Sequence, residues 1–187
     1  MRGKARALRF VTSNPHKFAE AESILKEFGV IIRHEKLSYR EERSESLAEI
    51  AADSARGLAG KVEAPFFVED SGLFVKALNG FPGTYSAWAL GKIGLPGLLR
   101  LMKGEGDRRA AFMSAIALFD GKKVLVFEGE VKGRIAFRQR GRGGFGYDPL
   151  FTPEGRSRTF AEMSGERKSA LSHRRRALEG LASHLQG

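Results

Sequence analysis

Apolar residues gather in short runs along the chain, and polar segments rich in turn-forming residues separate those runs. The first run, ALRFV at residues 7–11, predicts a β-strand. Asn14 and Pro15 follow it and favour the start of a helix, because an Asn side chain caps free N–H groups and Pro has no N–H to leave unpaired. Apolar side chains then recur at helical spacing, at Phe18, Ala21, Leu25 and Phe28.

Two longer stretches carry the clearest β-strand signals. Residues 65–78 are strongly apolar and predict a buried strand that a Glu-Asp-Ser-Gly segment breaks into two extended pieces. Residues 109–137 hold two apolar runs joined by Asp120-Gly121, a dipeptide typical of β-hairpins. The remaining pattern predicts a strand within residues 30–37 and helices that begin after Ser46, within residues 79–90, at Leu95 and after Ser164.

The order of these elements bounds the fold. Helices and strands mix along the chain, which indicates an α/β or α+β class whose sheet contains both parallel and antiparallel pairs. The chain of 187 residues has no internal repeat and no linker long enough to separate independent domains. We therefore expect residues 1–187 to form a single domain.

Composition excludes several classes of function. Apolar residues make up 42% of the chain and charged residues 29%, as in ordinary globular proteins. No apolar run approaches the roughly 18 residues that a membrane span needs, and the N-terminal residues lack a signal-peptide pattern. The absence of cysteine excludes disulfides, zinc–cysteine sites and thiol nucleophiles, and it fits a cytoplasmic protein.

The positive charge is concentrated in one segment. The net charge is +10, and residues 132–176 contain 12 Lys/Arg and four Asp/Glu, which places +8 of that charge there. Such a segment favours a polyanionic partner, either a nucleic acid or the phosphates of a small molecule. A solvated basic surface is the alternative interpretation.

The junction after the first predicted strand carries groups suited to phosphate. Thr12, Ser13 and Asn14 precede a helix whose free N–H groups form an anion site, and Lys17 adds a positive charge one turn later. The glycine-rich frame of a P-loop is missing. The alternative is a capped helix whose lysine faces water.

Two adjacent acids, Glu69 and Asp70, followed by Ser71, come directly after the apolar part of a predicted strand. Neighbouring strand residues point to opposite faces, so one acid is free to face a metal ion. Carboxylates suit Mg²⁺, which takes one or two of them together with substrate phosphates. The alternative is a polar strand end within a turn.

The glycine-rich loop at residues 143–149 carries aromatic and acidic side chains. Glycines let the backbone approach a ligand closely. Phe145 and Tyr147 offer flat faces for stacking a base, and Asp148 is suited to hydrogen-bond a base edge. The alternative is an aromatic loop packed on its own core.

A basic cluster near the C-terminus completes the candidates. Lys168 is suited to bind phosphate, and His173 and Arg174 are suited to donate hydrogen bonds to carbonyl oxygens. On one regular helix Lys168 and His173 would lie roughly 140° apart, so they share a ligand only if the ligand is large or the helix breaks between them. The second case predicts a break or offset near residues 169–172. The alternative is the solvated face of an amphipathic helix.

From Leu8 to Leu181 the chain resembles the inosine triphosphate pyrophosphatase family, through the motifs TSNPHK, VEDSG, LNGFPGTYS, GGFGYDP, TFAEM and KSALSHR in that order. The resemblance implies an α/β fold: a two-lobed single domain with a long curved mixed β-sheet flanked by helices, and an active site in the cleft between the lobes. It implies a homodimer with no membrane partner and no stable nucleic-acid partner. The implied reaction is Mg²⁺-dependent hydrolysis of ITP, dITP and XTP to the monophosphate and pyrophosphate, which cleans non-standard purines from the nucleotide pool.

The resemblance also assigns roles to residues. Asp70 would be the catalytic, metal-linked carboxylate that activates water, and Glu41 would be the second Mg²⁺ ligand, with Glu42 as the alternative. The family usually has Gly at the position of Ser13, and a positive φ there would strain a serine. The substrate would contact Thr12, Ser13, Asn14, Lys17, Ser71, Phe145, Gly146, Tyr147, Asp148, Lys168, His173 and Arg174.

Two other functions remain open from the sequence. A related pyrophosphatase with the same fold and reaction would act on modified pyrimidine nucleotides, although His173-Arg174 and the loop from Phe145 to Asp148 favour a purine. A nucleic-acid-binding module would use the basic segment, and its affinity would fall steeply with salt concentration.

Overall fold

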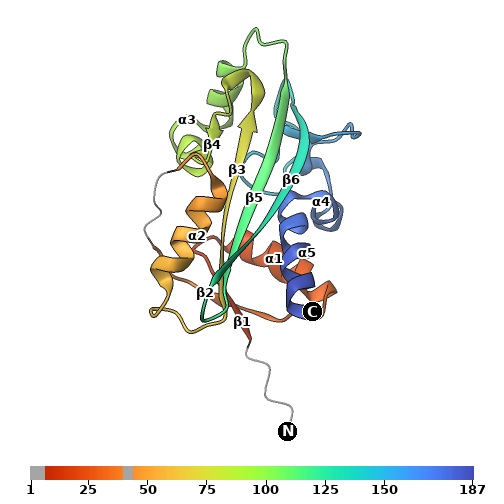
Figure 1. Cartoon of the computed structure of the whole chain (residues 1–187). Coiled ribbons are helices and arrows are strands. Elements are labelled where there is room, and N and C mark those ends of the chain that lie inside the picture. Colours follow the sequence, from red (N-terminus) through yellow and green to blue (C-terminus); the bar gives the residue numbers. More distant parts are fainter. Residues whose placement is uncertain (1–6, 40–43) are drawn as a thin grey trace. The chain divides into compact units, whose positions relative to one another are not determined.

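A computed structural model describes residues 7–39 and 44–187 of the chain (Figure 1). The strands are β1 Leu8–Val11, β2 Ile32–Glu35, β3 Phe66–Val75, β4 Pro82–Gly83, β5 Arg109–Phe119, β6 Val124–Ile135 and β7 Phe151–Pro153. The α-helices are α1 Pro15–Glu27, α2 Leu47–Leu58, α3 Ser86–Leu101, α4 Gly165–Leu171 and α5 His173–Gln186. Two short 3₁₀ helices are η1 Lys76–Leu78 and η2 Phe160–Glu162.

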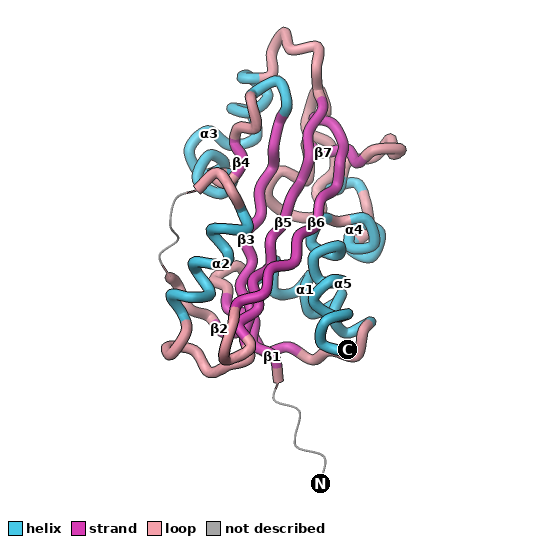
Figure 2. The backbone as a smooth tube through the Cα atoms, viewed as in Figure 1, coloured by secondary structure: helices cyan, strands magenta, loops and turns pink. Residues whose placement is uncertain are grey.

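The strands form one seven-stranded sheet in the order β2-β1-β3-β5-β6-β7, and β4 pairs with β3 (Figure 2). Strand β1 runs parallel to both β2 and β3, whereas β4 is antiparallel to β3 and β7 is antiparallel to β6. The predicted α/β class with a mixed sheet flanked by helices is therefore confirmed. Within the described residues no helix is both long and apolar enough to cross a lipid bilayer.

The chain divides into two compact units. The first unit comprises Met1–Asp70, Ala115–Glu128 and Arg175–Gly187. The second unit comprises Ser71–Ser114 and Gly129–Arg174. That residues 1–187 act as one domain, with the active site in a cleft between two lobes, stays a prediction.

The core of the first unit joins β1 and β3 to two helices. The parallel register pairs Phe10 with Phe67, and their rings stack with centroids 4.4 Å apart. Buried residues of α1 and α5, including Leu25 and Leu178, pack against the same cluster. Figure 1 shows α1 and α5 on one side of these strands and α2 on the other. This packing fixes the position of Val11, the last residue of β1. The polar segment that begins at Thr12 follows directly.

The core of the second unit is built around aromatic side chains. Phe112 of β5 contacts Phe151 of β7 edge to face, with ring centroids 4.7 Å apart, and Phe160 of η2 completes the group. Leu73 and Leu98 pack against the same cluster. This core supports the loop that precedes β7, which is the glycine-rich loop singled out in the sequence.

Strand β3 differs from the sequence prediction, because the Glu-Asp-Ser-Gly segment does not break it. Gly72 lies where β4 comes close, and a Cβ atom there would overlap the backbone oxygen of Gly83. The Ser86 hydroxyl accepts a hydrogen bond from the Leu73 backbone N–H (2.8 Å) and donates one to the Gly83 oxygen (2.6 Å). A short antiparallel partner thus keeps the polar segment in an extended conformation.

Local signals at the helix ends are confirmed in most cases. Gly94, with φ 61° and ψ −175°, interrupts α3 and separates the two helical pieces that the sequence predicted. The Ser46 hydroxyl caps α2 by accepting from the Glu49 N–H (3.3 Å). The reciprocal half of that capping box is replaced, because the Ser46 N–H donates to the Ser44 hydroxyl (3.0 Å), which in turn donates to the Glu49 carboxylate (2.5 Å).

Candidate active site

The predicted phosphate-binding segment forms the start of α1 in the first unit. The Asn14 side chain accepts hydrogen bonds from the N–H groups of His16 (2.9 Å) and Lys17 (3.2 Å), so the predicted N-cap is confirmed. The Thr12 hydroxyl accepts from the Asn14 N–H at 3.1 Å. The side chains of the turn between β1 and α1 thereby hold its conformation. The positive end of the α1 dipole lies at this turn.

Lys17 does not point into water, as the alternative interpretation required. Its Nζ donates a hydrogen bond to the backbone oxygen of Glu69, 3.2 Å away. The parallel pairing of β1 with β3 aligns Phe10 with Phe67, so the turn that follows β1 is level with Glu69, inside β3. The first turn of α1 and the acidic segment of β3 therefore belong to one arrangement.

Ser13 stands where the family usually has Gly, and its backbone is not strained by the change. Among residues 7–39 and 44–187, Asn79 alone of the non-glycine residues has a positive φ, at 52°. Ser13 is exposed, which leaves its hydroxyl at the surface of the turn. The strain considered for this position is therefore absent.

The two acids of β3 differ in burial, as alternation along a strand requires. Glu69 is 5% exposed, whereas Asp70 and the following Ser71 are half-buried. Asp70 is thus the more accessible oxygen donor. Glu41 and Glu42, the predicted partners for a second Mg²⁺ contact, lie outside the described residues.

Among the described residues, Asp70 fits Mg²⁺. No group of three or more His, Asp or Glu side chains that would hold a metal gathers in the described part of the chain. Mg²⁺ does not require such a group, because one or two carboxylates with substrate phosphates and water are its usual ligands. Asp70, in the middle of β3, is a carboxylate ligand of the required kind.

The glycine-rich loop of the second unit is held by a buried ion pair. The Asp148 carboxylate accepts from the Phe145 N–H (2.8 Å) and pairs with Lys168 Nζ at 2.6 Å. Asp148 is 3% exposed and Lys168 4% exposed, so the pair is withdrawn from water. Lys168 Nζ also lies 4.4 Å from the centre of the Phe145 ring. Asp148 and Lys168, predicted separately as a base contact and a phosphate contact, thus contact each other.

Two glycines shape this loop, and replacing them by alanine separates steric overlap from backbone strain. Gly144 and Gly146 have φ of 68° and 62°, so an alanine at either costs about 1–2 kcal/mol. A Cβ at Gly144 would overlap the Asp148 carboxylate, whereas no atom lies within 4 Å of one at Gly146. We expect Gly144→Ala to lower the free energy of unfolding by about 1–3 kcal/mol more than Gly146→Ala in urea denaturation. Equal losses would contradict this description of the loop.

The two aromatic rings of the loop have different surroundings. Tyr147 is 4% exposed, and its hydroxyl donates to the Ser86 backbone oxygen at 3.0 Å. Burial raises the pKa of Tyr147 to about 12, so this hydroxyl keeps its proton at neutral pH. Phe145 is half-buried and is the ring with surface left for a ligand. Tyr147 anchors the loop to the start of α3.

The predicted helix break is confirmed at Ser172, whose φ of −74° and ψ of 154° are extended. Helix α5 then begins with His173 and Arg174, which are 4% and 1% exposed. The His173 ring stacks on Phe112 with centroids 4.9 Å apart. The break removes the angular conflict of a single helix, so these side chains no longer lie on the solvated face of one regular helix.

Two cationic side chains of the second unit face the ring of Phe145. The Arg174 guanidinium lies 5.7 Å from the centre of this ring, which Lys168 also faces. Cationic nitrogen donors around an aromatic face suit a flat, electron-rich heterocycle with carbonyl oxygens. Sequence reasoning missed Phe112 and Ser86, which hold His173 and Tyr147, because both contacts join residues far apart in the chain.

The described candidates therefore form two groups: an anion- and metal-suited group at the start of α1, and a cationic, aromatic group around Phe145. Together with the mixed α/β sheet they define a candidate nucleotide-binding protein. A profile of the Ham1 family matches residues 8–184, and the chain belongs to that family.

Relatives of known activity cover almost the whole chain. It is 50% identical over 179 residues to the dITP/XTP pyrophosphatase of Thermococcus kodakarensis, covering 96% of this chain and 97% of that protein. It is 48% identical over 174 residues to the dITP/XTP pyrophosphatase of Methanopyrus kandleri, covering 92% and 93%.

Solved structures share the fold. A HAM1 protein from Coxiella burnetii has a TM-score of 0.84 at 32% identity and covers 96% of this chain and 98% of its own. The Staphylococcus aureus Ham1 protein has a TM-score of 0.80 at 31% identity, with the same coverage.

Proposed function

We propose that this chain is a pyrophosphatase that hydrolyses dITP, XTP and ITP to the monophosphate and pyrophosphate. The observation that carries the proposal is the buried pair of cations, Lys168 and Arg174, that face the half-buried ring of Phe145, with the buried His173 next to Arg174 in the chain. It occurs in a chain that is 50% identical to a dITP/XTP pyrophosphatase over 96% of its length. The reaction removes non-standard purines from the nucleotide pool.

Base selection in this proposal rests on hydrogen-bond polarity. Hypoxanthine and xanthine present an acceptor oxygen at position 6, which matches the N–H donors of Arg174 and His173. Adenine presents an amino group there, so donor would face donor in a buried site. Each unsatisfied buried group costs about 1–3 kcal/mol, which corresponds to a preference of roughly 5- to 150-fold per contact.

Phosphate binding is assigned to the first group. The N–H groups at the start of α1 and the ammonium of Lys17 would bind phosphate oxygens. Asp70 and Glu41 would hold Mg²⁺, which when bound supplies charge stabilisation to the phosphate oxygens. Asp70 would also orient the attacking water and accept its proton as the bond between the α- and β-phosphates breaks.

The proposal has further parts that come from the family resemblance. The two groups would face one nucleotide, with the base at Phe145 and the phosphates at Lys17. The enzyme would act as a homodimer in the cytoplasm and would have no stable nucleic-acid partner.

The decisive assay measures pyrophosphate release from dITP, XTP, dATP, dGTP and dCTP, with Mg²⁺ and with EDTA. We expect turnover of dITP and XTP in the presence of Mg²⁺ and none in EDTA. We expect kcat/KM for dATP to be lower than that for dITP by at least about 5-fold. Turnover that favours a pyrimidine would support the pyrimidine alternative. No turnover of any triphosphate, with tight salt-sensitive binding of DNA or RNA, would support the nucleic-acid module.

Arg174 supplies a sharper test of base selection. Arg174→Met keeps the length of the side chain and removes its donors, so we expect the dITP-over-dATP ratio of kcat/KM to fall by about 5- to 150-fold. Arg176→Met is the matched control, because Arg176 lies two residues further along α5 and is assigned no substrate contact. A ratio unchanged in Arg174→Met would contradict the assignment.

A further inference from the structure

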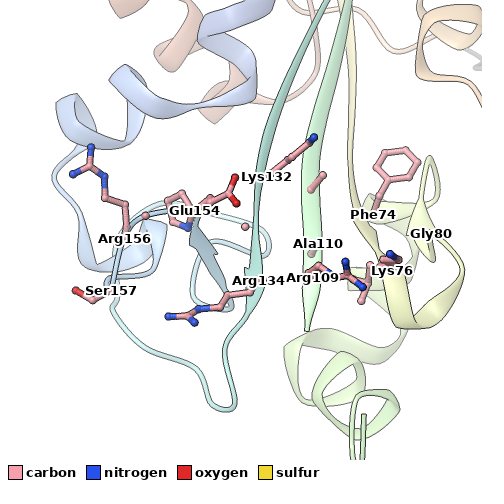
Figure 3. A pocket seen from close by; sticks show the side chains of 15 residues that line it. Phe74, Lys76, Gly80, Arg109, Ala110, Lys132, Arg134, Glu154, Arg156 and Ser157 are labelled. Carbon is pink, nitrogen blue, oxygen red and sulfur yellow. The ribbon is translucent and has the colours of Figure 1, made fainter. Parts of the chain in front are cut away.

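The second unit contains a cavity of about 860 Å³ that none of the candidate site residues lines. Its walls come from the end of β3 and η1, the start of β5, the end of β6 and the segment after β7. Figure 3 shows Phe74, Lys76 and Gly80 on one side of the two long strands, and Glu154, Arg156 and Ser157 on the other. Lys132 rises from β6 between them.

The cavity lies on the face of β6 opposite the aromatic core. Val131 and Ile135 are buried in that core, and side chains alternate along a strand. Lys132 and Arg134, the exposed residues of the opposite face, line the cavity. Val75 and Ala110 of the same core also line the cavity, but no residue of the group around Phe145 does.

Positive charge dominates the lining. Lys76, Arg109, Lys132, Arg134 and Arg156 contribute five cations, against the single carboxylate of Glu154. The second unit as a whole contains sixteen Lys/Arg and seven Asp/Glu, so it carries +9 of the net charge of +10. A hollow lined by one sign of charge concentrates ions of the other sign.

Most of these cations are not neutralised within the described residues. Arg109 pairs with Asp107 through two hydrogen bonds of 2.6 and 2.9 Å, which hold the pKa of Asp107 well below its usual range. Lys132, Arg134 and Arg156 form no ion pair with a described acid, whereas the charge of Lys76 also helps to lower the pKa of Asp107. With Glu154 as the carboxylate of the lining, the cavity keeps a net positive charge, and a bound polyanion would balance it.

Small residues line part of the cavity. Ala110, Ala111 and Gly133 line it where β5 and β6 run side by side. A Cβ at Gly133 would overlap the Thr152 oxygen and the Phe151 ring, so glycine is required for β7 to approach β6 this closely. Backbone without bulky side chains lets a ligand approach the strands between the longer cations.

We propose that this cavity is a second anion site and that it binds a compact oligophosphate. Its volume falls within the roughly 300–1,000 Å³ typical of small-ligand sites. Five cations against one carboxylate in the lining match the charge of a tri- or pyrophosphate group better than that of a single carboxylate or phosphate. The oligophosphate is either inorganic or part of a free nucleotide, and both sources share the chemistry that the cavity recognises.

The test counts tripolyphosphate sites by isothermal titration calorimetry of the full chain in EDTA at low salt. We expect two equivalents for the unchanged protein and one for Lys132→Glu/Arg134→Glu, whose kcat/KM for dITP stays within about 2-fold. Lys122→Glu/Lys123→Glu is the matched control, because both lysines are exposed in the turn between β5 and β6, outside the cavity. It carries the same charge change and keeps two equivalents. A parallel titration with dATP distinguishes a nucleotide from an inorganic ligand, since only a nucleotide site binds dATP more tightly than tripolyphosphate.

Three results would overturn the proposal. The first is a stoichiometry that Lys132→Glu/Arg134→Glu leaves unchanged. The second is a loss in that variant of binding to a single-stranded oligonucleotide with tripolyphosphate binding intact, which would make the surface a nucleic-acid contact. The third is a change of oligomeric state in sedimentation velocity, which would mean that a second copy of the chain covers the cavity.

Discussion

Asp70→Asn is expected to lower kcat for dITP by about 10³-fold while leaving the protein folded. The change removes the negative charge that would hold Mg²⁺ and accept a proton from water, and electrostatic contributions of this kind amount to several kcal/mol in the transition state. Asp70 is half-buried in the middle of β3, so the isosteric amide fits the same space. Pyrophosphate release under saturating dITP and Mg²⁺ measures the effect.

The control for this prediction is Asp53→Asn on α2. Asp53 is an acid paired with Arg56 at 2.5 Å, with 48% of its side chain exposed. Exposed pairs of this kind contribute little to stability, so activity and melting temperature should both stay close to those of the unchanged protein. A residual kcat above about a tenth of normal in Asp70→Asn would remove this residue from the catalytic role.

Lys168→Met is expected to lower the free energy of unfolding by about 3–5 kcal/mol, because it leaves the Asp148 carboxylate without its buried cation. The two side chains are 5% and 4% exposed and 2.6 Å apart. For a chain of this size each kcal/mol lowers the melting temperature by about 2–4 °C, so a fall of about 6–20 °C is expected in thermal denaturation.

The double variant Asp148→Asn/Lys168→Met distinguishes a lost pair from lost packing. In the unchanged protein the Phe145 N–H donates a hydrogen bond to the Asp148 carboxylate at 2.8 Å. An amide at position 148 still offers an oxygen to this N–H, but the amide carries no charge. We therefore expect the double variant to be more stable than Lys168→Met alone. If the second substitution adds a further loss of equal size, the buried charge is not the cause.

Local chemistry made part of this structure predictable. The start of α1 followed from Asn14 and Pro15, and the hairpin followed from Asp120-Gly121, because each depends on residues a few positions apart. The helix break at Ser172 was inferred from the need to bring Lys168 and His173 to one ligand. Signals between residues a few positions apart can be interpreted without knowledge of the tertiary fold.

Contacts between distant segments were not predictable in the same way. The continuity of β3 depends on Gly83 and Ser86, which fold back onto the strand as β4 and the start of α3. Lys168 and Asp148, each predicted to contact a ligand, form an ion pair with each other. Nothing in the spacing of these residues states which will pair, because tertiary packing decides it.

The most direct test of the central claim is a crystal structure of Asp70→Asn with dITP and Mg²⁺. The account predicts the base beside Phe145, its 6-oxo group within about 2.7–3.2 Å of a nitrogen of His173 or Arg174, and the triphosphate reaching Lys17. A nucleotide bound only in the cavity around Lys132, or with its base remote from Phe145, would contradict it.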